Sequence, residues 1–367
     1  MKQAGREAAV LVTAVILILV LSVFGMVQKD KGISSSERRA LAGFPEADAD
    51  SILSGDFMDR FESYAQDQFP FRDTFRRLKA LTVMVLLQKQ DNNGIYYEEG
   101  HLGKLDYPLQ PRQQEHILER MDYLYRTWLE GKSGRLYFSI VPDKNYYLAG
   151  TSYPTMDYDL LLKKMQEGTP YLTYIDITDC LDKEDYYYTD THWRQEELEE
   201  VAHRLAEAME VNLEAAYSIK EVEVPFYGVY AGQSALPVKA DRIRYLTNPV
   251  LEDCIVTSYD TGQPVVKKIY DEEKLSGNDP YEFFLSGADA LMIIDNPRAK
   301  EEKELIVFRD SFGSSLIPLL LPAYSRITVI DTRYISSSML GNYVSFENKD
   351  VLFLYSTLLL NSSMGVK

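Results

Sequence analysis

The chain has 367 residues, of which 46% are hydrophobic and 26% charged, and its formal net charge is −17. This is the composition of a folded protein, with enough length for one large domain or two smaller ones. The acidic balance argues against a nucleic-acid-binding protein, because phosphate contacts need clustered Lys and Arg, and it does not favour docking on anionic lipid either.

An uncharged apolar segment lies close to the N-terminus. Residues 8–27 read AAVLVTAVILILVLSVFGMV, about the length that spans the hydrocarbon of a bilayer. Because Lys2 and Arg6 precede it, we expect the N-terminus in the cytoplasm and everything after about residue 30 outside. A cleaved signal peptide is the alternative, although the segment is long for one and no clear cleavage site follows. We therefore predict a cytoplasmic tip and single-pass membrane anchor in residues 1–28.

The residues after the anchor change in character twice. Residues 29–50 are polar and rich in small side chains, which is typical of a juxtamembrane linker. Residues 51–88 show helical periodicity, with a break at Phe69-Pro70 because proline does not continue a helix. Residues 92–105 read NNGIYYEEGHLGKL, which predicts a short strand between two turns. We assign residues 51–367 to one extracytoplasmic domain.

From residue 110 onward, helical and strand patterns alternate. Amphipathic periodicity predicts helices at 113–131, 158–168, 194–211 and 314–324. Compact apolar runs predict buried strands at 135–142, 171–177, 304–310, 326–331 and 350–356. This alternation predicts an α/β fold with a mostly parallel sheet flanked by helices. The alternation of helices and strands is interrupted between about residues 212 and 291, a segment that we interpret as a β-rich insertion.

The cysteines and histidines do not form a recognisable metal motif. Cys180 and Cys254 lie in the exported part, where a disulfide is permitted, but two free buried thiols fit the sequence equally well. The four histidines, at positions 101, 116, 192 and 203, are scattered, and neither C-x-x-C nor H-E-x-x-H occurs. We therefore predict neither a metal nor an organic cofactor. His203 stands mid-helix among Glu and Ala, where a solvated or packing role is expected.

Two loops at the ends of predicted strands carry reactive side chains. Sheets of this type place their active sites at the carboxyl ends of the strands. Ser311, in FRDSFGSS, stands between a predicted strand and a helix, so the free N–H groups of that helix face the same space as its hydroxyl. The G-x-S-x-G elbow of ordinary α/β-hydrolases is absent. The alternative is that Asp310 or Ser311 is simply a helix N-cap.

The second loop, YYYTDTHW, contains Asp190 and His192. In an extended segment, positions i and i+2 point to the same side, so Asp190 can orient His192 and leave the second ring nitrogen free for a hydroxyl nucleophile. The alternative is that Thr189, Asp190 or Thr191 caps the following helix and His192 is incidental. Together the two loops predict a Ser–His–Asp site.

Several segments resemble the DHHW family of exported bacterial proteins and, more broadly, the alginate O-acetyltransferase branch of SGNH-type hydrolases. The pair TDTHW and RDSFG is the most specific part, although the sequence reads DTHW rather than DHHW and has Arg309 where glycine is usual in the superfamily. The matching segments are QFPFRDTFRRLKA (68–80), NNGIYYEEGHLGKL (92–105), FSIVPDKNYYL (138–148), YYYTDTHWRQEE (186–197), PFYGVYAGQSA (225–235), FRDSFGSSLIPLL (308–320) and IDTRYI (330–335).

The resemblance implies a role for each matching residue. Ser311 corresponds to the acylated nucleophile, His192 to the general base and Asp190 to the orienting acid. No convincing oxyanion glycine or asparagine block is found, so we expect the Ser311 N–H to serve there. Weaker candidates for oxyanion or substrate contact are Arg333, Tyr334, Asp310, Trp193 and Lys144. Trp193 either walls the pocket or packs the start of the helix, and Lys144 either faces the cleft or is a surface lysine.

The resemblance further implies a membrane-anchored, extracytoplasmic O-acetyltransferase that modifies a cell-surface or secreted polysaccharide through an acyl-enzyme. Acetyl-CoA is not expected outside the cytoplasm, so a multi-pass membrane O-acyltransferase is implied as the partner that supplies acyl groups. The same triad with water as acceptor would be a polysaccharide acetylesterase. A non-catalytic envelope or polysaccharide-binding protein with an inherited fold is the third reading.

Overall fold

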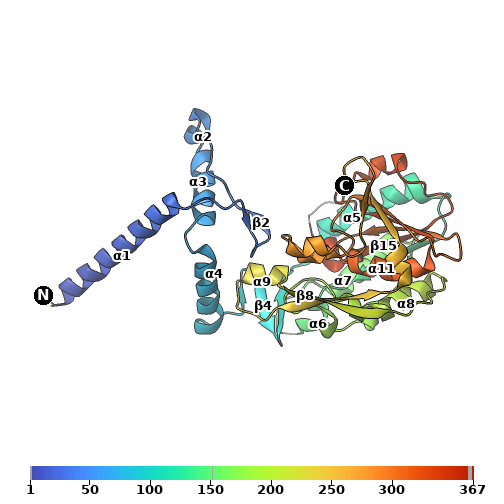
Figure 1. The fold of residues 1–367 in the computed structure, drawn as a ribbon, viewed down its shortest axis with the longest axis horizontal. Coiled ribbons are helices and arrows are strands. Elements are labelled where there is room, and N and C mark those ends of the chain that lie inside the picture. Colours follow the sequence, from blue (N-terminus) through green and yellow to red (C-terminus); the bar gives the residue numbers. More distant parts are fainter. Residues whose placement is uncertain (1, 151, 363–365) are drawn as a thin grey trace. The chain divides into compact units, whose positions relative to one another are not determined.

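The computed structural model describes residues 2–150, 152–362 and 366–367. They fall into two compact units (Figure 1). Unit 1 comprises residues up to 93 together with 231–237, and unit 2 comprises residues 94–230 and 238–367. Residues 51–93, which we had assigned to the large domain, therefore cluster with the N-terminal helix.

Unit 1 is built mainly from helices. Its elements are α1 (Lys2–Val27), β1 (Ile33–Ser34), β2 (Arg39–Ala40), α2 (Ala49–Ser54), α3 (Asp56–Asp67), α4 (Arg72–Leu81), a π-helical turn (Thr82–Leu86), β3 (Asp91–Asn92) and the later part of α9 (Val229–Ser234). Among the described residues, one helix is long and apolar enough to cross a membrane, over Arg6–Gly25 of α1. A signal sequence near an N-terminus meets the same criterion of length and apolar composition.

Unit 2 contains the alternating helices and strands. Its helices are α5 (Pro111–Leu124, extended by a π-helical turn over Tyr125–Leu129), α6 (Asn145–Leu148), α7 (Tyr158–Gly168), α8 (Glu199–Ala208), α10 (Pro249–Asp253), α11 (Gly313–Leu320) and α12 (Thr357–Leu360). Its strands are β4 (Ile95–Glu98), β5 (His101–Lys104), β6 (Leu136–Val141), β7 (Thr173–Tyr174), β8 (Ser218–Phe226), β9 (Asp241–Thr247), β10 (Ile255–Ser258), β11 (Val265–Lys267), β12 (Leu291–Asp295), β13 (Glu304–Arg309), β14 (Arg326–Ile330) and β15 (Asp350–Ser356).

A large, mostly parallel sheet organises unit 2. Within the described residues its strand order is β11-β10-β12-β14-β13-β15-β6-β7. The neighbours from β14 to β7 pair in parallel, whereas β12, β10 and β11 extend one edge in antiparallel fashion. The predicted α/β fold class with its mostly parallel sheet is confirmed. The predicted strands at 135–142, 304–310, 326–331 and 350–356 correspond to β6, β13, β14 and β15.

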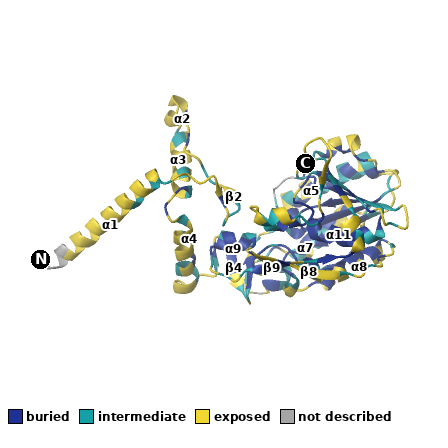
Figure 2. Cartoon of the chain, viewed as in Figure 1, coloured by how far each residue is buried: buried dark blue, intermediate teal, exposed yellow. Residues whose placement is uncertain are grey.

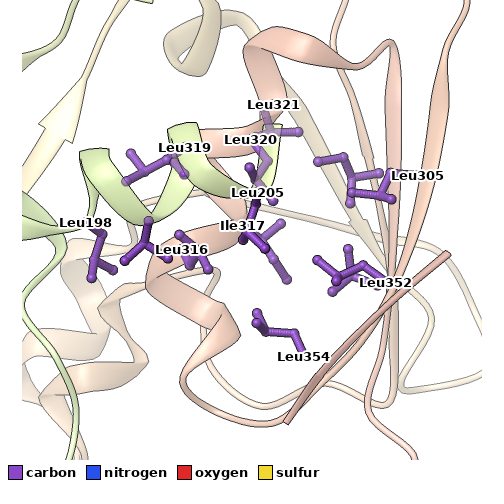
Figure 3. Packing of buried hydrophobic residues seen from close by; sticks show 14 of the residues in the cluster. Leu198, Leu205, Leu305, Leu316, Ile317, Leu319, Leu320, Leu321, Leu352 and Leu354 are labelled. Atoms are coloured by element: carbon purple, nitrogen blue, oxygen red, sulfur yellow. The ribbon is translucent and has the colours of Figure 1, made fainter. Parts of the chain in front are cut away.

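Side chains of the central strands alternate between two hydrophobic cores. Along β13, Leu305 and Val307 enter the core that α8 and α11 cover, whereas Ile306 and Phe308 enter the core that α5 and α7 cover. Figure 3 shows the first core, with leucines of both helices against Leu305 and Leu352. Because both faces are buried, the strands are continuous apolar runs, which explains why sequence alone identifies them.

Three expected elements differ from the structure. The strand expected at 171–177 is reduced to β7, which within the described part of the chain pairs with β6 at the sheet edge. The helix expected at 194–211 begins only at Glu199. The segment 212–291 is β-rich as expected, but it is not one insertion: β8 and β9 form a separate hairpin, while β10 and β11 join the main sheet.

The two cysteines are free thiols in the structure, Cys180 buried and Cys254 partly so. Burial raises the pKa of the Cys180 thiol to about 11 and that of Cys254 to about 12.

We therefore expect Cys180 to alkylate in the folded protein about 100-fold and Cys254 about 1000-fold more slowly at pH 8 than an ordinary cysteine, because only the thiolate reacts. Iodoacetamide labelling followed by mass spectrometry, without reductant, measures this, and both sites should label fully after denaturation. Failure of the two thiols to label in denaturant would reveal a disulfide.

Candidate active site

Ser311 lies on a tight turn from β13 into α11. A Cβ atom at Gly313 would lie 2.8 Å from the Cβ of Arg309, so the absence of a side chain lets the helix turn back close to its strand. Ser311 itself is half-buried, while its neighbours on both sides are buried. The turn thus leaves this hydroxyl at the carboxyl end of β13, next to the start of a helix.

Asp310 braces this turn. One carboxylate oxygen accepts the Phe312 N–H at 3.0 Å, and the other accepts the Ser356 N–H of β15 at 2.8 Å. Both oxygens are therefore bonded to backbone, and a carboxylate would repel an oxyanion. This corrects the expectation that Asp310 contacts the oxyanion or substrate: its role is structural.

The turn also provides a backbone donor. Within the described part of the chain, the Ser311 N–H has no acceptor. By contrast, the Gly313 N–H donates to the Asp310 carbonyl at 3.1 Å, and the Ser314 N–H donates to the Ser311 carbonyl at 3.1 Å. An N–H group beside the nucleophile is suited to hold a developing oxyanion. That role of the Ser311 N–H stays a prediction.

The loop that carries His192 is closed by backbone pairing. Tyr186 and Trp193 form an isolated antiparallel bridge, and the Tyr187 N–H donates to the His192 carbonyl at 3.2 Å. A short 3-10 turn at Gln195–Glu197 separates this loop from α8. The alternative in which residues 189–191 cap the helix is therefore wrong, since the helix begins much later.

The structure brings Asp190, His192 and Ser311 into one chain of hydrogen bonds. The Nδ1 atom of His192 lies 2.6 Å from Oδ1 of Asp190, and Nε2 lies 2.8 Å from Oγ of Ser311. Asp190 is completely buried and His192 nearly so. With the proton on Nδ1 held by Asp190, Nε2 is free to accept the hydroxyl proton of Ser311. In such a chain the imidazole can remove the proton of the serine hydroxyl as the oxygen attacks, which makes that oxygen a strong nucleophile.

A second segment supports Asp190 from outside its loop. The remaining oxygen, Oδ2, accepts the Val229 N–H at 2.8 Å. This is possible because Gly228 has no side chain: a Cβ atom there would lie 2.3 Å from the Thr189 carbonyl oxygen and 2.4 Å from Cα of Asp190. Both residues belong to the 225–235 segment that carried the family resemblance, so a signal for them was present in the sequence.

Lys144 is neither a surface lysine nor a cleft residue. Its side chain is buried, and Nζ donates to the carbonyl oxygens of Leu102 at 2.9 Å and Tyr187 at 2.6 Å. Burial lowers the pKa of Lys144 to about 7, although the carboxylates of Asp241 and Asp190 oppose that fall. Lys144 thus fastens the start of the histidine loop to β5, which corrects both expectations for it.

Asp241 holds the same loop from the other side. Its carboxylate accepts the N–H groups of Tyr188 and Thr189, each at 2.8 Å, and the Thr189 hydroxyl at 2.5 Å. Sequence reasoning missed this residue, because it lies in β9, about 50 positions away from the loop. Asp241 and Lys144 together leave few conformations open to the residues just before Asp190.

Trp193 joins the histidine loop to the serine turn. It is completely buried, and its indole N–H is shared between the Phe312 carbonyl at 3.1 Å and Ser315 Oγ at 2.9 Å. Gln195 adds a bond from Nε2 to the Ser315 carbonyl at 2.6 Å. Trp193 therefore does not wall a substrate pocket, as one expectation had it, but packs beneath the site and aligns the two loops.

A tyrosine from the 212–291 segment completes the surroundings of His192. The ring of Tyr281 stacks on the imidazole, with centroids 3.7 Å apart and an interplanar angle of 5°. Its hydroxyl lies 2.9 Å from Ser315 Oγ, the atom that also accepts the Trp193 N–H. No sequence pattern singles out Tyr281, whereas Ser315 lies in the 308–320 segment that carried the family resemblance. Both restrict the imidazole to one plane.

The remaining candidates are placed as follows. Arg333 donates to both carboxylate oxygens of Asp331, at 2.8 and 2.6 Å, and Tyr334 is exposed. A role of either residue toward the oxyanion stays a prediction. His203 lies exposed on α8. Among the described residues, no group of three or more His, Cys, Asp and Glu side chains is arranged to hold a metal.

Solved structures of similar fold exist. A DHHW family protein from Eubacterium siraeum is 20% identical, with a TM-score of 0.59 over 74% of this chain and 94% of that chain. The chain has the fold of a DHHW family protein. Bacillus cereus PatB1 bearing a sulfonyl adduct is 16% identical, with a TM-score of 0.57 over 74% of this chain and 96% of that chain. A second structure of PatB1 is 15% identical, with a TM-score of 0.56 over 74% of this chain and 98% of that chain.

Comparison of the sequence with known proteins adds nothing to these likenesses. No family profile matches the chain, and no curated protein matches it. At these identities the structural likeness establishes the fold alone.

Replacing Gly228 by alanine tests the support of Asp190. We expect Gly228→Ala to lower the free energy of unfolding by about 1–3 kcal/mol, because the new methyl group overlaps backbone atoms that cannot move aside. Denaturant unfolding measures this. The matched control is Gly43→Ala, since nothing lies within 4 Å of a Cβ atom at Gly43. Equal stability of the two variants would contradict the packing described here.

Proposed function

We propose that this chain is a membrane-anchored, extracytoplasmic O-acetyltransferase acting on a cell-surface or secreted polysaccharide. The observation that carries the proposal is the hydrogen-bond chain Asp190–His192–Ser311, with distances of 2.6 and 2.8 Å. Support comes from the fold shared with a DHHW family protein and from the apolar N-terminal helix. The polysaccharide as substrate follows from the motif resemblance.

The reaction begins with acylation of Ser311. Its Oγ attacks the carbonyl carbon of the acyl donor while His192 Nε2 takes the hydroxyl proton, and Asp190 stabilises the resulting imidazolium. The negative charge on the former carbonyl oxygen is stabilised by the Ser311 N–H. Collapse of this intermediate breaks the bond to the leaving group, which takes the proton from His192. An acyl ester of Ser311 remains.

Transfer to the acceptor repeats these steps in reverse. A sugar hydroxyl attacks the acyl ester while His192 takes its proton, and collapse releases the acetylated sugar and returns the proton to Ser311. The acyl donor would come from a multi-pass membrane O-acyltransferase, since acetyl-CoA is not expected outside the cytoplasm. If water replaces the sugar, the same steps constitute an acetylesterase.

A sulfonyl fluoride tests whether Ser311 is nucleophilic. The sulfonyl adduct on PatB1 makes this reagent class the natural choice. We expect phenylmethylsulfonyl fluoride to modify Ser311 at a rate that falls about 100-fold or more in His192→Ala, because the hydroxyl then lacks its base. Peptide mass spectrometry gives the site and rate, and exposed Ser338→Ala serves as the matched control. Unlabelled Ser311 in the folded protein would favour a non-catalytic polysaccharide-binding protein.

Acyl transfer is tested separately with an aryl acetate. We expect the purified protein to release the aryl alcohol faster when an acceptor with free hydroxyl groups is added. The acceptor is an oligosaccharide prepared from a naturally acetylated polysaccharide by chemical removal of its acetyl groups. Mass spectrometry should then show acetylated oligosaccharide, and Ser311→Ala should form none. Release that is unaffected by sugar, with acetate as the only product, would instead establish the esterase.

A further inference from the structure

The helix α4 and the π-helical turn after it present an apolar surface to solvent. Figure 2 shows α4 as largely exposed. The large apolar side chains, here called the α4 face, are 41–74% exposed: Phe71, Phe75, Leu78, Leu81, Val85 and Leu86. Their spacing of three and four residues places most of them along one side of a helix. A contiguous apolar surface of this kind marks a contact with lipid or protein.

The apolar side of α4 faces outward and its polar side faces unit 1, whereas a helix of a soluble domain buries its apolar side. Helix α4 is attached to unit 1 through its polar side, where Arg72 and Arg76 pair with Glu37. Arg76 also donates to the Gly232 carbonyl at 2.6 Å. Ala80 is the only residue of α4 that is buried among the described side chains. The ion pairs thus fix which side of the helix faces outward, and that side is the apolar one.

The start of the α4 face is continuous with the candidate membrane span. Phe71 stacks on Phe24, with ring centroids 5.6 Å apart and an interplanar angle of 9°. Phe24 stands near the end of the apolar segment Arg6–Gly25. If α1 crosses a bilayer, Phe71 therefore lies at the depth where hydrocarbon meets headgroups. Phe, Trp and Leu side chains at that depth are typical of helices that lie in the membrane interface.

The local charge of α4 also differs from that of the whole chain. Its sequence RDTFRRLKAL contains four basic residues and one acidic residue, in a chain whose net charge is −17. Arg77 and Lys79 are exposed beside the apolar side chains. An apolar stripe flanked by Arg and Lys is the pattern of helices that lie in an anionic membrane interface. The overall charge, which does not favour lipid, is therefore misleading for this helix.

We propose that the α4 face binds the surface of the membrane that α1 anchors, with its apolar side chains among the upper acyl chains and Arg77 and Lys79 at anionic headgroups. This inference rests on the proposed membrane anchoring. It adds a second membrane contact, made by residues 71–86, so that unit 1 is held against the bilayer along a helix rather than tethered at one point.

Tryptophan fluorescence in vesicles tests the proposal. The full-length variant Leu78→Trp is reconstituted into phosphatidylcholine–phosphatidylglycerol vesicles, with and without bromine on the acyl chains. The matched control is Leu160→Trp, 51% exposed in unit 2 against 57% at Leu78. Leu17→Trp, in the apolar segment, reports anchoring. The wild-type signal of Trp128 and Trp193 is subtracted.

We expect brominated lipid to lower the emission of Leu78→Trp and Leu17→Trp about twofold or more and to leave Leu160→Trp unchanged, because this quencher acts only on contact. Quenching at residue 17 without quenching at residue 78 would overturn the inference and leave the anchor intact. A blue-shifted but unquenched emission from the Leu78→Trp variant would also overturn it, since protein would then cover the face. Quenching at neither position would refute the anchor as well.

Discussion

The candidate site depends on a buried contact between two loops that are about 120 residues apart in the sequence. The indole N–H of Trp193 and the amide of Gln195 bond to the first turn of α11, and these bonds fix the distance between His192 and Ser311. The side chains of Trp193 and Gln195 are both completely buried. In such surroundings an unpaired polar group costs about 1–3 kcal/mol. Moving the two loops apart would leave these groups unpaired, so the bonds keep the loops in fixed relative positions.

Buried, hydrogen-bonded polar side chains also hold the segments around the site. The segment Pro142–Asn145 at the end of β6 buries Asp143, Lys144 and Asn145 together. Asp143 accepts the Thr357 hydroxyl at 2.7 Å and the Tyr158 hydroxyl at 2.8 Å, and Lys144 donates to the Tyr187 carbonyl at the start of the histidine loop. These three polar side chains are thus buried and structural, and Lys144 is not the cleft residue that the sequence allowed. They keep a reactive chain of three side chains rigid while leaving Ser311 partly open.

Unit 1 shows the opposite distribution of polar and apolar groups. There the ion pairs of Arg72 and Arg76 with Glu37 lie inward and the aromatic and aliphatic side chains outward. Unit 2 buries its apolar residues in two cores on either side of its sheet. The two units therefore differ in which groups they bury, and the outward apolar side chains of α4 are the ones that we propose contact the membrane.

The apolar span, the order of the central strands and helices along the chain, and the three side chains Asp190, His192 and Ser311 that the structure joins by hydrogen bonds could all be predicted from the sequence. These are local properties: hydrophobic periodicity identifies buried strands such as β13 and β15, and the D-x-H spacing puts two side chains on one side of an extended segment. The surroundings of the site, by contrast, depend on how distant segments pack together. Tyr281 and Asp241 reach it from parts of the chain that are distant from both loops, and Lys144 and Trp193 are buried, because long-range packing has no signature in local spacing.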